Sequence, residues 1–343
     1  MIYLVTGGGG FIGSHLVEAL LSRDNQVRIL DNFSTGRREN LNDLIHRYDL
    51  IPDRDYIWTD SPPPSSHNKY RLTIIEGDIR NLDSCRKATE GATYVLHQAA
   101  LPSVPRSIAD PLTTHEVNVN GTLNLLLAAR DAGIERFVYA SSSSVYGDSP
   151  TLPKVETMIP RPLSPYAGSK LMGEYYCQIF NHVWGLSTIC LRYFNVYGPR
   201  QDPISPYAAV IPKFIDALQK DQPPVIYGDG EQSRDFTFID DCVQANLLAC
   251  QAQFDRGFSM PNIDQIGKWI MNIAYGHRVT LNQLYRELCS LLNSNVAPCY
   301  AEPRPGEVRH SLADIQRAKN LLNYQPRVSI QEGLRKTLMH YHC

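Results

Sequence analysis

A glycine-rich segment near the N-terminus, VTGGGGFIGSHL (residues 5–16), constrains this chain more than any other feature. The apolar run before it predicts a strand, and the apolar residues after it recur at helical spacing. Glycine lets a backbone approach another group closely, and a helix N-terminus attracts phosphate through its unpaired N–H groups. The glycines fit both the G-x-x-G-x-x-G and the G-x-G-x-x-G spacing, so the segment predicts a dinucleotide-binding loop. The residues expected to line this loop are Gly7, Gly10, Phe11, Ile12 and Gly13.

The second predicted strand, QVRILD, ends in an acidic residue, Asp31, at the distance from the glycine loop that such a site requires. A carboxylate there can accept hydrogen bonds from the adenosine ribose and would repel a 2′-phosphate. We therefore expect NAD as the cofactor, with Asn32 beside it, although Arg37 and Arg38 lie close enough to weaken the preference over NADP. The alternative is a glycine-rich hairpin with a surface aspartate, which the order of strand, loop, helix and acid disfavours.

Composition limits the classes of protein to which this chain can belong. Its 343 residues, 43% of them hydrophobic, can fill one large domain or two modest ones. A net charge of -2 provides no basic surface for nucleic acid or for a membrane. The cysteines are scattered without a C-x-x-C pair or a His/Cys cluster, so we expect neither a metal site nor a disulfide framework. No apolar run reaches the roughly 18 residues of a membrane span, and we expect a cytoplasmic protein.

Strands and helices alternate through the first half of the sequence, which predicts an α/β fold. The expected architecture is a Rossmann-like, doubly wound parallel sheet with a smaller C-terminal α/β substrate domain. Further strands are expected in RLTIIEGDIRN (71–81), ATYVLHQAA (92–100) and IERFVYASSSS (134–144). After the first of these, Asp78 and Ile79 are expected to border the adenine ring, although Asp78 can equally cap a helix.

The sequence also indicates an insertion and the approximate limits of two domains. Residues 48–70 contain several prolines and no clean periodicity, so we expect a surface insertion there. Its aromatic residues could cover a ligand or an oligomer contact, and a solvated excursion is the alternative. We place the NAD-binding domain at 1–190, with a later segment, 236–256, returning to it, and the substrate domain mainly at 191–343.

A tyrosine and a lysine are spaced for acid–base chemistry in the segment PLSPYAGSKLMGEYY. Ser164 and Pro165 predict the start of a helix, which places Tyr166 in its first turn and Lys170 one turn later on the same face. An ammonium near a phenol lowers the pKa of the phenol, so Tyr166 could take a proton from a substrate hydroxyl while hydride leaves for NAD. The alternative is an exposed Tyr–Lys pair on a helix without a catalytic role. The glycine loop and Asp31 in the same sequence favour the catalytic interpretation.

Many further motifs follow in a fixed order along the chain. They include HQAALPSVPRSIADP (97–111), SSSSVYG (141–147), SPYAGSK (164–170), LRYFNVYGPRQDP (191–203), IYGDGEQSRDF (226–236) and RPGEVRH (304–310). With these motifs the chain resembles the extended short-chain dehydrogenase/reductases. It is most similar to nucleotide-sugar 4-epimerases, in particular the branch that acts on UDP-N-acetylhexosamines.

The resemblance implies roles for particular residues. Ser142 would hydrogen-bond the reacting hydroxyl, and Ser143 would line the sugar pocket. The residues that the resemblance places along the cofactor are Ala99, Ala100, Asn118, Tyr166 and Lys170. Those that it places along the UDP-sugar are Asn195, Ala209, Val210, Tyr227, Arg234, Arg304 and Ser311. The two arginines also suit the task chemically, because a guanidinium fork matches the oxygens of a diphosphate. By resemblance we also expect a homodimer, joined through helices near 115–130 and 166–183.

The implied reaction is 4-epimerisation of a UDP-sugar through a transient 4-keto sugar. Ser311 stands where glucose-restricted relatives carry a tyrosine, which leaves room for an N-acetyl group and favours UDP-N-acetylglucosamine over UDP-glucose; the serine could also cap the next helix. A uronate 4-epimerase is a close alternative, since Arg106 could meet a carboxylate. Dehydratases and decarboxylases are disfavoured by Ser143 and Ser144, which replace their acid/base pair. A non-catalytic NAD-binding regulator is disfavoured by the intact Ser142, Tyr166 and Lys170.

Overall fold

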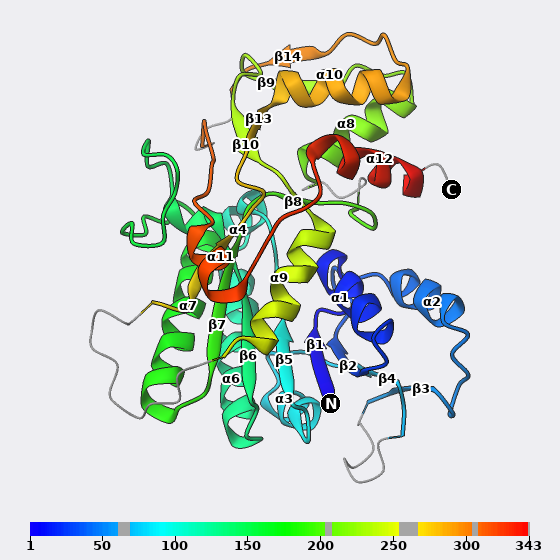
Figure 1. Ribbon diagram of the computed structural model, residues 1–343, viewed down its shortest axis with the longest axis vertical. Helices are drawn as coiled ribbons and strands as arrows, with labels where there is room; N and C mark the ends of the chain where they lie inside the picture. Colours follow the sequence, from blue (N-terminus) through cyan, green and yellow to red (C-terminus); the bar gives the residue numbers. More distant parts are fainter. Residues whose placement is uncertain (61–68, 203–207, 254–266, 304–307, 342–343) are drawn as a thin grey trace. The chain divides into compact units, whose positions relative to one another are not determined.

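The computed structural model describes residues 1–60, 69–202, 208–253, 267–303 and 308–341, whose helices and strands are drawn in Figure 1. The chain divides into two compact units. Unit 1 comprises Met1–Ser142, Ser164–Arg192 and Val243–Met271, and unit 2 comprises Ser143–Leu163, Tyr193–Cys242 and Asn272–Cys343. Within the described part of the chain, every helix is too short or too polar to span a membrane.

Unit 1 is built on one sheet with the strand order β12-β7-β6-β5-β1-β2-β4-β3. Its strands are β1 (Ile2–Thr6), β2 (Gln26–Asp31), β3 (Tyr56–Thr59), β4 (Leu72–Glu76), β5 (Tyr94–His97), β6 (Arg136–Ser142), β7 (Thr188–Tyr193) and β12 (Ile270–Ile273). The pairings from β6 across to β3 are parallel. The Rossmann-like fold class is therefore confirmed. The strands β1, β2, β4, β5 and β6 end in Thr6, Asp31, Glu76, His97 and Ser142, and the parallel pairing brings these polar residues to one edge of the sheet.

The helices of unit 1 follow the strands in the alternation that the sequence predicts (Figure 1). They are α1 (Phe11–Leu21), α2 (Arg38–Arg47), α3 (Leu82–Thr89), α4 (Val104–Ala109), α5 (Pro111–His115), α6 (Gly121–Asp131) and α7 (Pro165–Trp184). A single π-helical turn, η2 (Glu116–Asn120), joins α5 to α6. Helix α9 (Ile239–Gln251) begins in unit 2 and continues in unit 1. One-turn π-helices are rare and often occur at functional sites, so η2 draws attention to Asn118.

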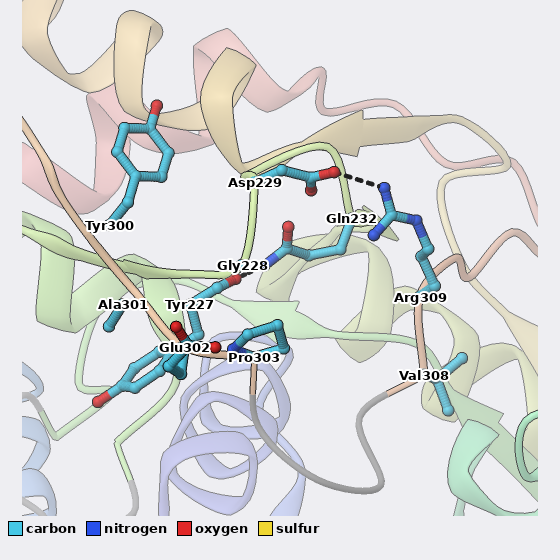
Figure 2. Close-up of a pocket in the computed structure, with 10 residues that line it drawn as sticks. All are labelled: Tyr227, Gly228, Asp229, Gln232, Tyr300, Ala301, Glu302, Pro303, Val308 and Arg309. Carbon is cyan, nitrogen blue, oxygen red and sulfur yellow. Dashed lines mark hydrogen bonds and ion pairs between the residues drawn. The ribbon is translucent and has the colours of Figure 1, made fainter.

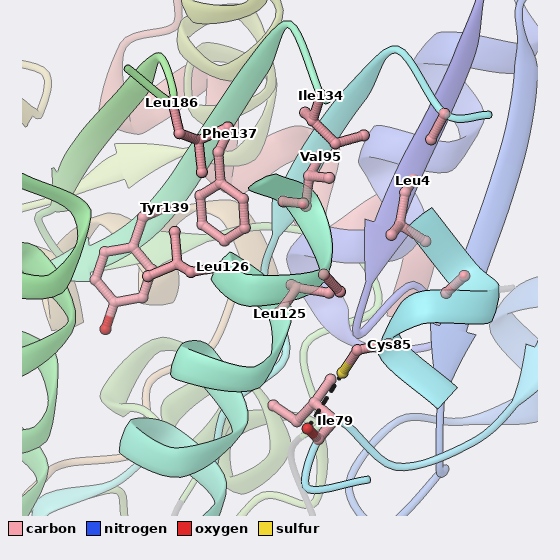
Figure 3. Packing of buried hydrophobic residues seen from close by; sticks show 14 of the residues in the cluster. Leu4, Ile79, Cys85, Val95, Leu125, Leu126, Ile134, Phe137, Tyr139 and Leu186 are labelled. Carbon is pink, nitrogen blue, oxygen red and sulfur yellow. Dashed lines mark hydrogen bonds between the residues drawn. The ribbon is translucent and has the colours of Figure 1, made fainter. Parts of the chain in front are cut away.

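A continuous apolar core fixes the helices on this sheet (Figure 3). Leu4, Val95 and Phe137 come from three neighbouring strands and are completely buried. Leu125 and Leu126 of α6 pack into the same cluster. Burial of a Leu or Phe side chain is worth about 1.5–3 kcal/mol. This core therefore holds the polar edge of the sheet in a fixed arrangement.

The edge strand β3 is the main departure from the expected fold. The sequence predicts an irregular insertion over 48–70, but Tyr56–Thr59 pairs in parallel with β4, with Trp58 opposite Ile74. The reason the pattern misses it is its length: four half-buried residues show no period that a sequence pattern can detect. Residues 61–68 lie outside the described part of the chain.

Among its described residues, unit 2 has three small two-stranded sheets. They pair β8 (Val196–Tyr197) with β11 (Thr237–Phe238), β9 (Val225–Tyr227) with β14 (Cys299–Ala301), and β10 (Ser233–Asp235) with β13 (Arg278–Thr280). Its helical segments are η3 (Ser143–Tyr146), α8 (Val210–Gln219), α10 (Leu281–Leu292), α11 (Gln316–Leu322) and α12 (Ile330–Tyr341). A buried carboxylate, Asp235, joins separate segments of this unit by accepting hydrogen bonds from the backbone N–H groups of Gly276 and Ala313 at 3.1 Å.

Candidate active site

The glycine loop between β1 and α1 has no room for side chains. Gly7 has a φ of +68°, and a Cβ atom on it would lie 2.8 Å from the backbone nitrogen of Ala99. A Cβ on Gly13 would lie 2.0 Å from the carbonyl oxygen of Gly7, so α1 packs against the end of β1 as only glycine permits. Gly10 caps α1 without a side-chain hydrogen bond, so no capping hydroxyl occupies the first-turn N–H groups of Phe11 and Ile12, and N–H groups at a helix N-terminus can bind phosphate. The loop therefore fits the pyrophosphate of a dinucleotide.

Asp31 binds the glycine loop to the end of β2. Its carboxylate accepts hydrogen bonds from the backbone N–H groups of Gly9 and Phe33, both at 2.8 Å. Burial raises the pKa of Asp31, while these two N–H groups act in the opposite direction. The carboxylate is thus fixed beside the loop, where the ribose of an adenosine would lie.

The residues expected at the adenine ring differ in their surroundings. Asn32 donates to the Asp78 carboxylate at 2.8 Å, and Arg80 forms an ion pair with the same carboxylate at 2.7 Å. The Arg80 side chain lowers the pKa of Asp78. Ile79 is buried in the core cluster, where its backbone carbonyl accepts from the thiol of Cys85 (Figure 3). The cap of α3 is Asn81, so the alternative that Asp78 caps the following helix is wrong.

Ser142, Tyr166 and Lys170 lie together in unit 1. Helix α7 begins as predicted: the Ser164 side chain accepts from the backbone N–H of Ala167 at 3.1 Å, and Pro165 occupies the first turn. Ser142, at the end of β6, hydrogen-bonds the Tyr166 phenol. The Lys170 ammonium donates to the carbonyl oxygen of Ala140 in β6 at 2.8 Å. The helix and the strand thereby hold the hydroxyl, the phenol and the ammonium at one edge of the sheet.

The expected lowering of the Tyr166 pKa is not present in this structure. Burial raises the pKa of Tyr166 above 10.0, and the hydrogen bond from Ser142 is what opposes it. Burial lowers the pKa of Lys170 to about 8. The physical reason is that desolvation disfavours both charged forms, and the Lys170 ammonium donates to Ala140. An additional positive charge near the phenol is therefore needed before Tyr166 can act as a base.

A buried histidine that the sequence analysis missed connects β1 to the π-helical turn. His97 Nδ1 lies 2.7 Å from the Thr6 hydroxyl, and its Nε2 lies 2.9 Å from the Thr122 hydroxyl. Thr122 donates its own hydrogen to the Asn118 carbonyl at 2.6 Å, so it must accept from Nε2–H, which assigns the tautomer. Burial lowers the pKa of His97 to about 3, so the ring is neutral. The only sequence signal for it is a polar residue at the end of an apolar strand.

Asn118 connects the hydrogen-bond network of His97 to α7, the helix that contains Tyr166. Its side-chain oxygen accepts from the backbone N–H of Leu101 at 2.8 Å, and its amide donates to the Ser169 hydroxyl at 3.1 Å. Ser169 donates to the backbone carbonyl of Tyr166 at 2.8 Å. Asn118 is therefore a positioning residue that fixes the first turn of α7 against the loop after β5.

A second buried cluster supports the strand that carries Ser142. Glu174 lies one turn beyond Lys170 on α7 and accepts from the Ser141 hydroxyl at 2.5 Å. Arg192 of β7 donates to both of its carboxylate oxygens, at 2.8 and 2.7 Å. Both charged side chains are almost completely inaccessible to solvent. The spacing Tyr166, Lys170 and Glu174, each one turn apart, is the signal that could have identified this residue.

Unit 2 contains a separate pocket of about 670 Å³ (Figure 2). Tyr227 and Tyr300 supply aromatic rings, and Arg309 forms an ion pair with Asp229 at 2.7 Å at its margin. The remaining lining residues are Gly228, Gln232, Ala301, Glu302, Pro303 and Val308. Of the residues expected along the substrate, Tyr227 lies in this pocket.

Arg234 and Ser311, which are also expected along the substrate, are not among the residues that line this pocket. Arg234 donates to the backbone carbonyls of Ser233 and Arg309 at 3.0 and 3.2 Å, and the backbone N–H of Ser311 donates to the same Ser233 carbonyl at 3.0 Å. Helix α11 begins at Gln316, so the alternative that Ser311 caps it is wrong.

The remaining expected residues of unit 2 lie in separate segments of the sequence. Asn195 has a φ of +35° and donates to the Asp235 carbonyl at 3.3 Å. Ser143 opens η3, whereas Ala209 and Val210 start α8. Arg304 lies outside the described residues.

Comparison with known proteins identifies the family. The model of the NAD dependent epimerase/dehydratase family matches residues 3–261. A putative UDP-glucose 4-epimerase from Methanocaldococcus jannaschii is 35% identical over 337 residues, covering 98% of this chain and 96% of that protein. The UDP-N-acetylglucosamine 4-epimerase from Methanobrevibacter ruminantium M1, solved with UDP-N-acetylmuramic acid, has a TM-score of 0.85 at 39% identity and covers 99% of this chain and 97% of its own. The UDP-glucuronic acid 4-epimerase from Bacillus cereus, solved with UDP-glucuronic acid and NAD, has a TM-score of 0.84 at 31% identity, covering 100% and 99%.

The matched range includes every residue of the unit 1 site, from the glycine loop to Arg192. The resemblance drawn from the sequence motifs is thereby confirmed at the level of the family. Because the match spans most of the chain and the similarity to solved structures spans all of it, this protein is an enzyme of the NAD dependent epimerase/dehydratase family, with NAD as its cofactor.

Proposed function

We propose that this enzyme interconverts the carbon-4 epimers of a UDP-sugar, and that UDP-N-acetylglucosamine and UDP-N-acetylgalactosamine are its preferred pair. The observation that carries the proposal is the contact between Ser142 and Tyr166, with Lys170 one turn away on α7. This set can move one proton to and from a hydroxyl. The relatives described above, which are named as 4-epimerases of UDP-sugars, support the same reaction class.

In the proposed mechanism, the chain moves a proton and holds the nucleotide part of the substrate. Ser142 hydrogen-bonds the carbon-4 hydroxyl, and the Tyr166 phenolate removes its proton. Bound NAD supplies the hydride acceptor that oxidises carbon 4 and then the hydride that reduces it from the opposite face. With a pKa of about 8, Lys170 is mostly an ammonium at neutral pH, and together with the positively charged nicotinamide ring of bound NAD it would stabilise the phenolate.

We assign NAD to unit 1 and the nucleotide part of the sugar substrate to unit 2. The glycine loop and Asp31 support the first assignment. The aromatic rings of Tyr227 and Tyr300 in the unit 2 pocket support the second, since they can stack on a uracil base. Strong binding of the nucleotide leaves the hexose free to present either face of carbon 4.

The preference for an N-acetylated sugar rests on Ser311. A hydroxymethyl side chain occupies less volume than the phenol of the relatives restricted to glucose, and the backbone of Ser311 is fixed by its bond to Ser233. Because Ser311 does not cap α11, its side chain has no structural role in that helix. UDP-glucose and UDP-glucuronate are the competing substrates.

The test is incubation of the purified enzyme, without added cofactor, with each of the three UDP-sugars, followed by chromatography of the products. The proposal predicts that UDP-N-acetylglucosamine is converted fastest, and that Tyr166→Phe lowers the rate at least about a hundredfold while NAD remains bound. If only UDP-glucuronate is converted, the choice of sugar is wrong and the reaction class stands. If no sugar is converted by the NAD-loaded enzyme, the reaction class is wrong.

We also propose that the enzyme is a homodimer joined through α7. Four apolar side chains at helical spacing, Met172, Tyr175, Ile179 and Val183, are between 41% and 57% exposed along one face of this helix. Helices α4 and α5, which contact α7, expose Ile108 and Leu112. Exposed apolar side chains that recur along one helix face are typical of a protein–protein interface. Light scattering should give the mass of a dimer for the wild type and of a monomer for Ile179→Glu; a wild-type monomer contradicts the proposal.

A further inference from the structure

Three side chains form a stack beside the adenosine end of the cofactor site. The rings of Phe33 and Trp58 are nearly parallel, with centroids 5.5 Å apart and an angle of 27°. The Arg38 guanidinium lies 4.5 Å from the centroid of Phe33 and 5.1 Å from that of Trp58. Phe33 immediately follows the Asp31–Asn32 pair, and Arg38 is the first residue of α2. The stack thus combines the loop after β2, helix α2 and the edge strand β3.

Glu76, at the end of β4, holds the same guanidinium. Its carboxylate pairs with Arg38 at 2.5 Å. Trp58 adds a hydrogen bond to this carboxylate, and Arg38 and Trp58 together lower the pKa of Glu76. Trp58 therefore contacts both members of the ion pair, and it comes from the segment whose role the sequence left open. An exposed ion pair alone is weak, but the two rings and the indole N–H restrict Arg38 to one position.

The stack lies directly against the residues expected to bind the adenosine. In the sheet, Asp31 is paired with Glu76 on the neighbouring strand. The charges of Arg38 and Glu76 both act on Asp31, in opposite directions. On the other side, a Cβ on Gly9 would lie 2.8 Å from the Phe33 ring, so this ring covers the glycine loop.

We propose that Trp58 and Glu76 hold Arg38 away from the adenosine ribose and so make the enzyme select NAD over NADP. A guanidinium near the ribose is the natural partner of a 2′-phosphate, because it can donate two parallel hydrogen bonds to it. Here that guanidinium is paired with Glu76, and the Asp31 carboxylate is fixed beside the glycine loop where the ribose would lie. Arg37 adds a second positive charge next to Arg38, so the selection rests on how Glu76 and Trp58 position Arg38 and not on the number of charges. This inference concerns the cofactor alone and does not depend on which sugar is converted.

The test is a competition between the two cofactors on the full-length protein. Each variant is equilibrated with equimolar NAD and NADP, passed through a desalting column, and denatured in acid so that the released nucleotides can be separated and quantified. The proposal predicts that Glu76→Gln raises the bound ratio of NADP to NAD about tenfold, since it removes the charge that holds Arg38. The double variant Glu76→Gln/Arg38→Met should lose that gain.

Two further variants distinguish the stack from general electrostatics. Asp83→Asn, on α3, changes the net charge by the same amount and should leave the ratio unchanged. Trp58→Phe keeps an aromatic ring but removes the indole N–H, and it should raise the ratio in the same direction as Glu76→Gln. The inference is overturned if Glu76→Gln leaves the ratio unchanged, or if its gain persists when Arg38 is replaced. Because the readout is bound nucleotide, an enzyme that converts none of the three sugars would still give a decisive result.

Discussion

The Lys170 ammonium donates a hydrogen bond to the carbonyl oxygen of Ala140 at 2.8 Å, with the side chain only 4% exposed to solvent. It also lies 5.1 Å from the centroid of the Tyr139 ring. One carbonyl and one aromatic face replace the water around a free ammonium, and this loss of hydration lowers the pKa of Lys170 to about 8. The enzyme thus keeps a buried cation one helical turn from Tyr166, and this burial lowers its stability.

Lys170→Met should remove that cost. In wild type the pKa of Lys170 is about 8 in the folded protein and 10.5 in the unfolded chain. Burial of the ammonium therefore destabilises the fold fully at pH 7, less as the pH rises above about 8, and not at all above 10.5. We expect the free energy of unfolding of wild type to rise relative to the variant by about 1–3 kcal/mol between pH 7 and pH 10. Urea denaturation at both pH values measures this change, and the comparison cancels any constant difference in NAD binding. A relative fall with rising pH would contradict it.

His97 should make the enzyme sensitive to acid. The pKa of His97 is about 3 in the folded protein and 6.5 in the unfolded chain. Between these values the unfolded chain binds a proton that the folded protein does not bind. The free energy of unfolding therefore falls as the pH decreases from 6.5 toward 3. His97→Gln can accept from Thr6 and donate to Thr122 but cannot be protonated. Between pH 7 and pH 4.5 we expect wild type to lose about 2–3 kcal/mol more than the variant. Equal losses in urea denaturation would show that His97 is not buried as described.

The Glu174–Arg192 pair should show strong coupling. Glu174→Met leaves the buried guanidinium without an anionic partner, and breaking such a pair costs about 3–5 kcal/mol. Glu174→Met/Arg192→Met removes both charges, so it should cost clearly less than the sum of the single variants Glu174→Met and Arg192→Met. Urea denaturation of the four proteins forms a double-mutant cycle. Additive losses would mean that the two side chains do not stabilise each other.

Gly13→Ala should abolish NAD binding. The added methyl would lie 2.0 Å from the Gly7 carbonyl oxygen, so α1 must move away from the glycine loop. Gly168→Ala in α7 is the matched control, because a Cβ there has no heavy atom within 4 Å, and it should stabilise the helix by up to about 1 kcal/mol. The NAD released by acid from each purified protein gives the comparison. Wild-type NAD content in Gly13→Ala would refute the packing described here.

The sequence predicts best what is local. The strands that end in Thr6 and His97 are continuous apolar runs, the strand that ends in Asp31 is mostly apolar, and the start of α7 is marked by Ser164 and Pro165. Strand β3 escapes detection because four half-buried residues between prolines have no period.

Local sequence patterns do not predict contacts between distant segments. His97 meets Thr6 and Thr122 only because the register of the sheet and the π-helical turn bring positions so far apart together. In the same way, Trp58 reaches Arg38 only because β3 extends the sheet beside β4. The Tyr166–Lys170 spacing predicts that both residues lie on one helix, as they do in α7, but it does not predict the effect of burial on both pKa values.

The central claim is that the hydride of carbon 4 leaves the sugar and returns to the same molecule within one binding event. It is tested most directly with UDP-N-acetylglucosamine that carries deuterium at carbon 4, incubated with the enzyme in ordinary water without added NAD. Mass spectrometry and proton NMR of the UDP-N-acetylgalactosamine formed should show that deuterium is retained at carbon 4. Epimer that has lost the deuterium to solvent would contradict transient oxidation by a bound cofactor.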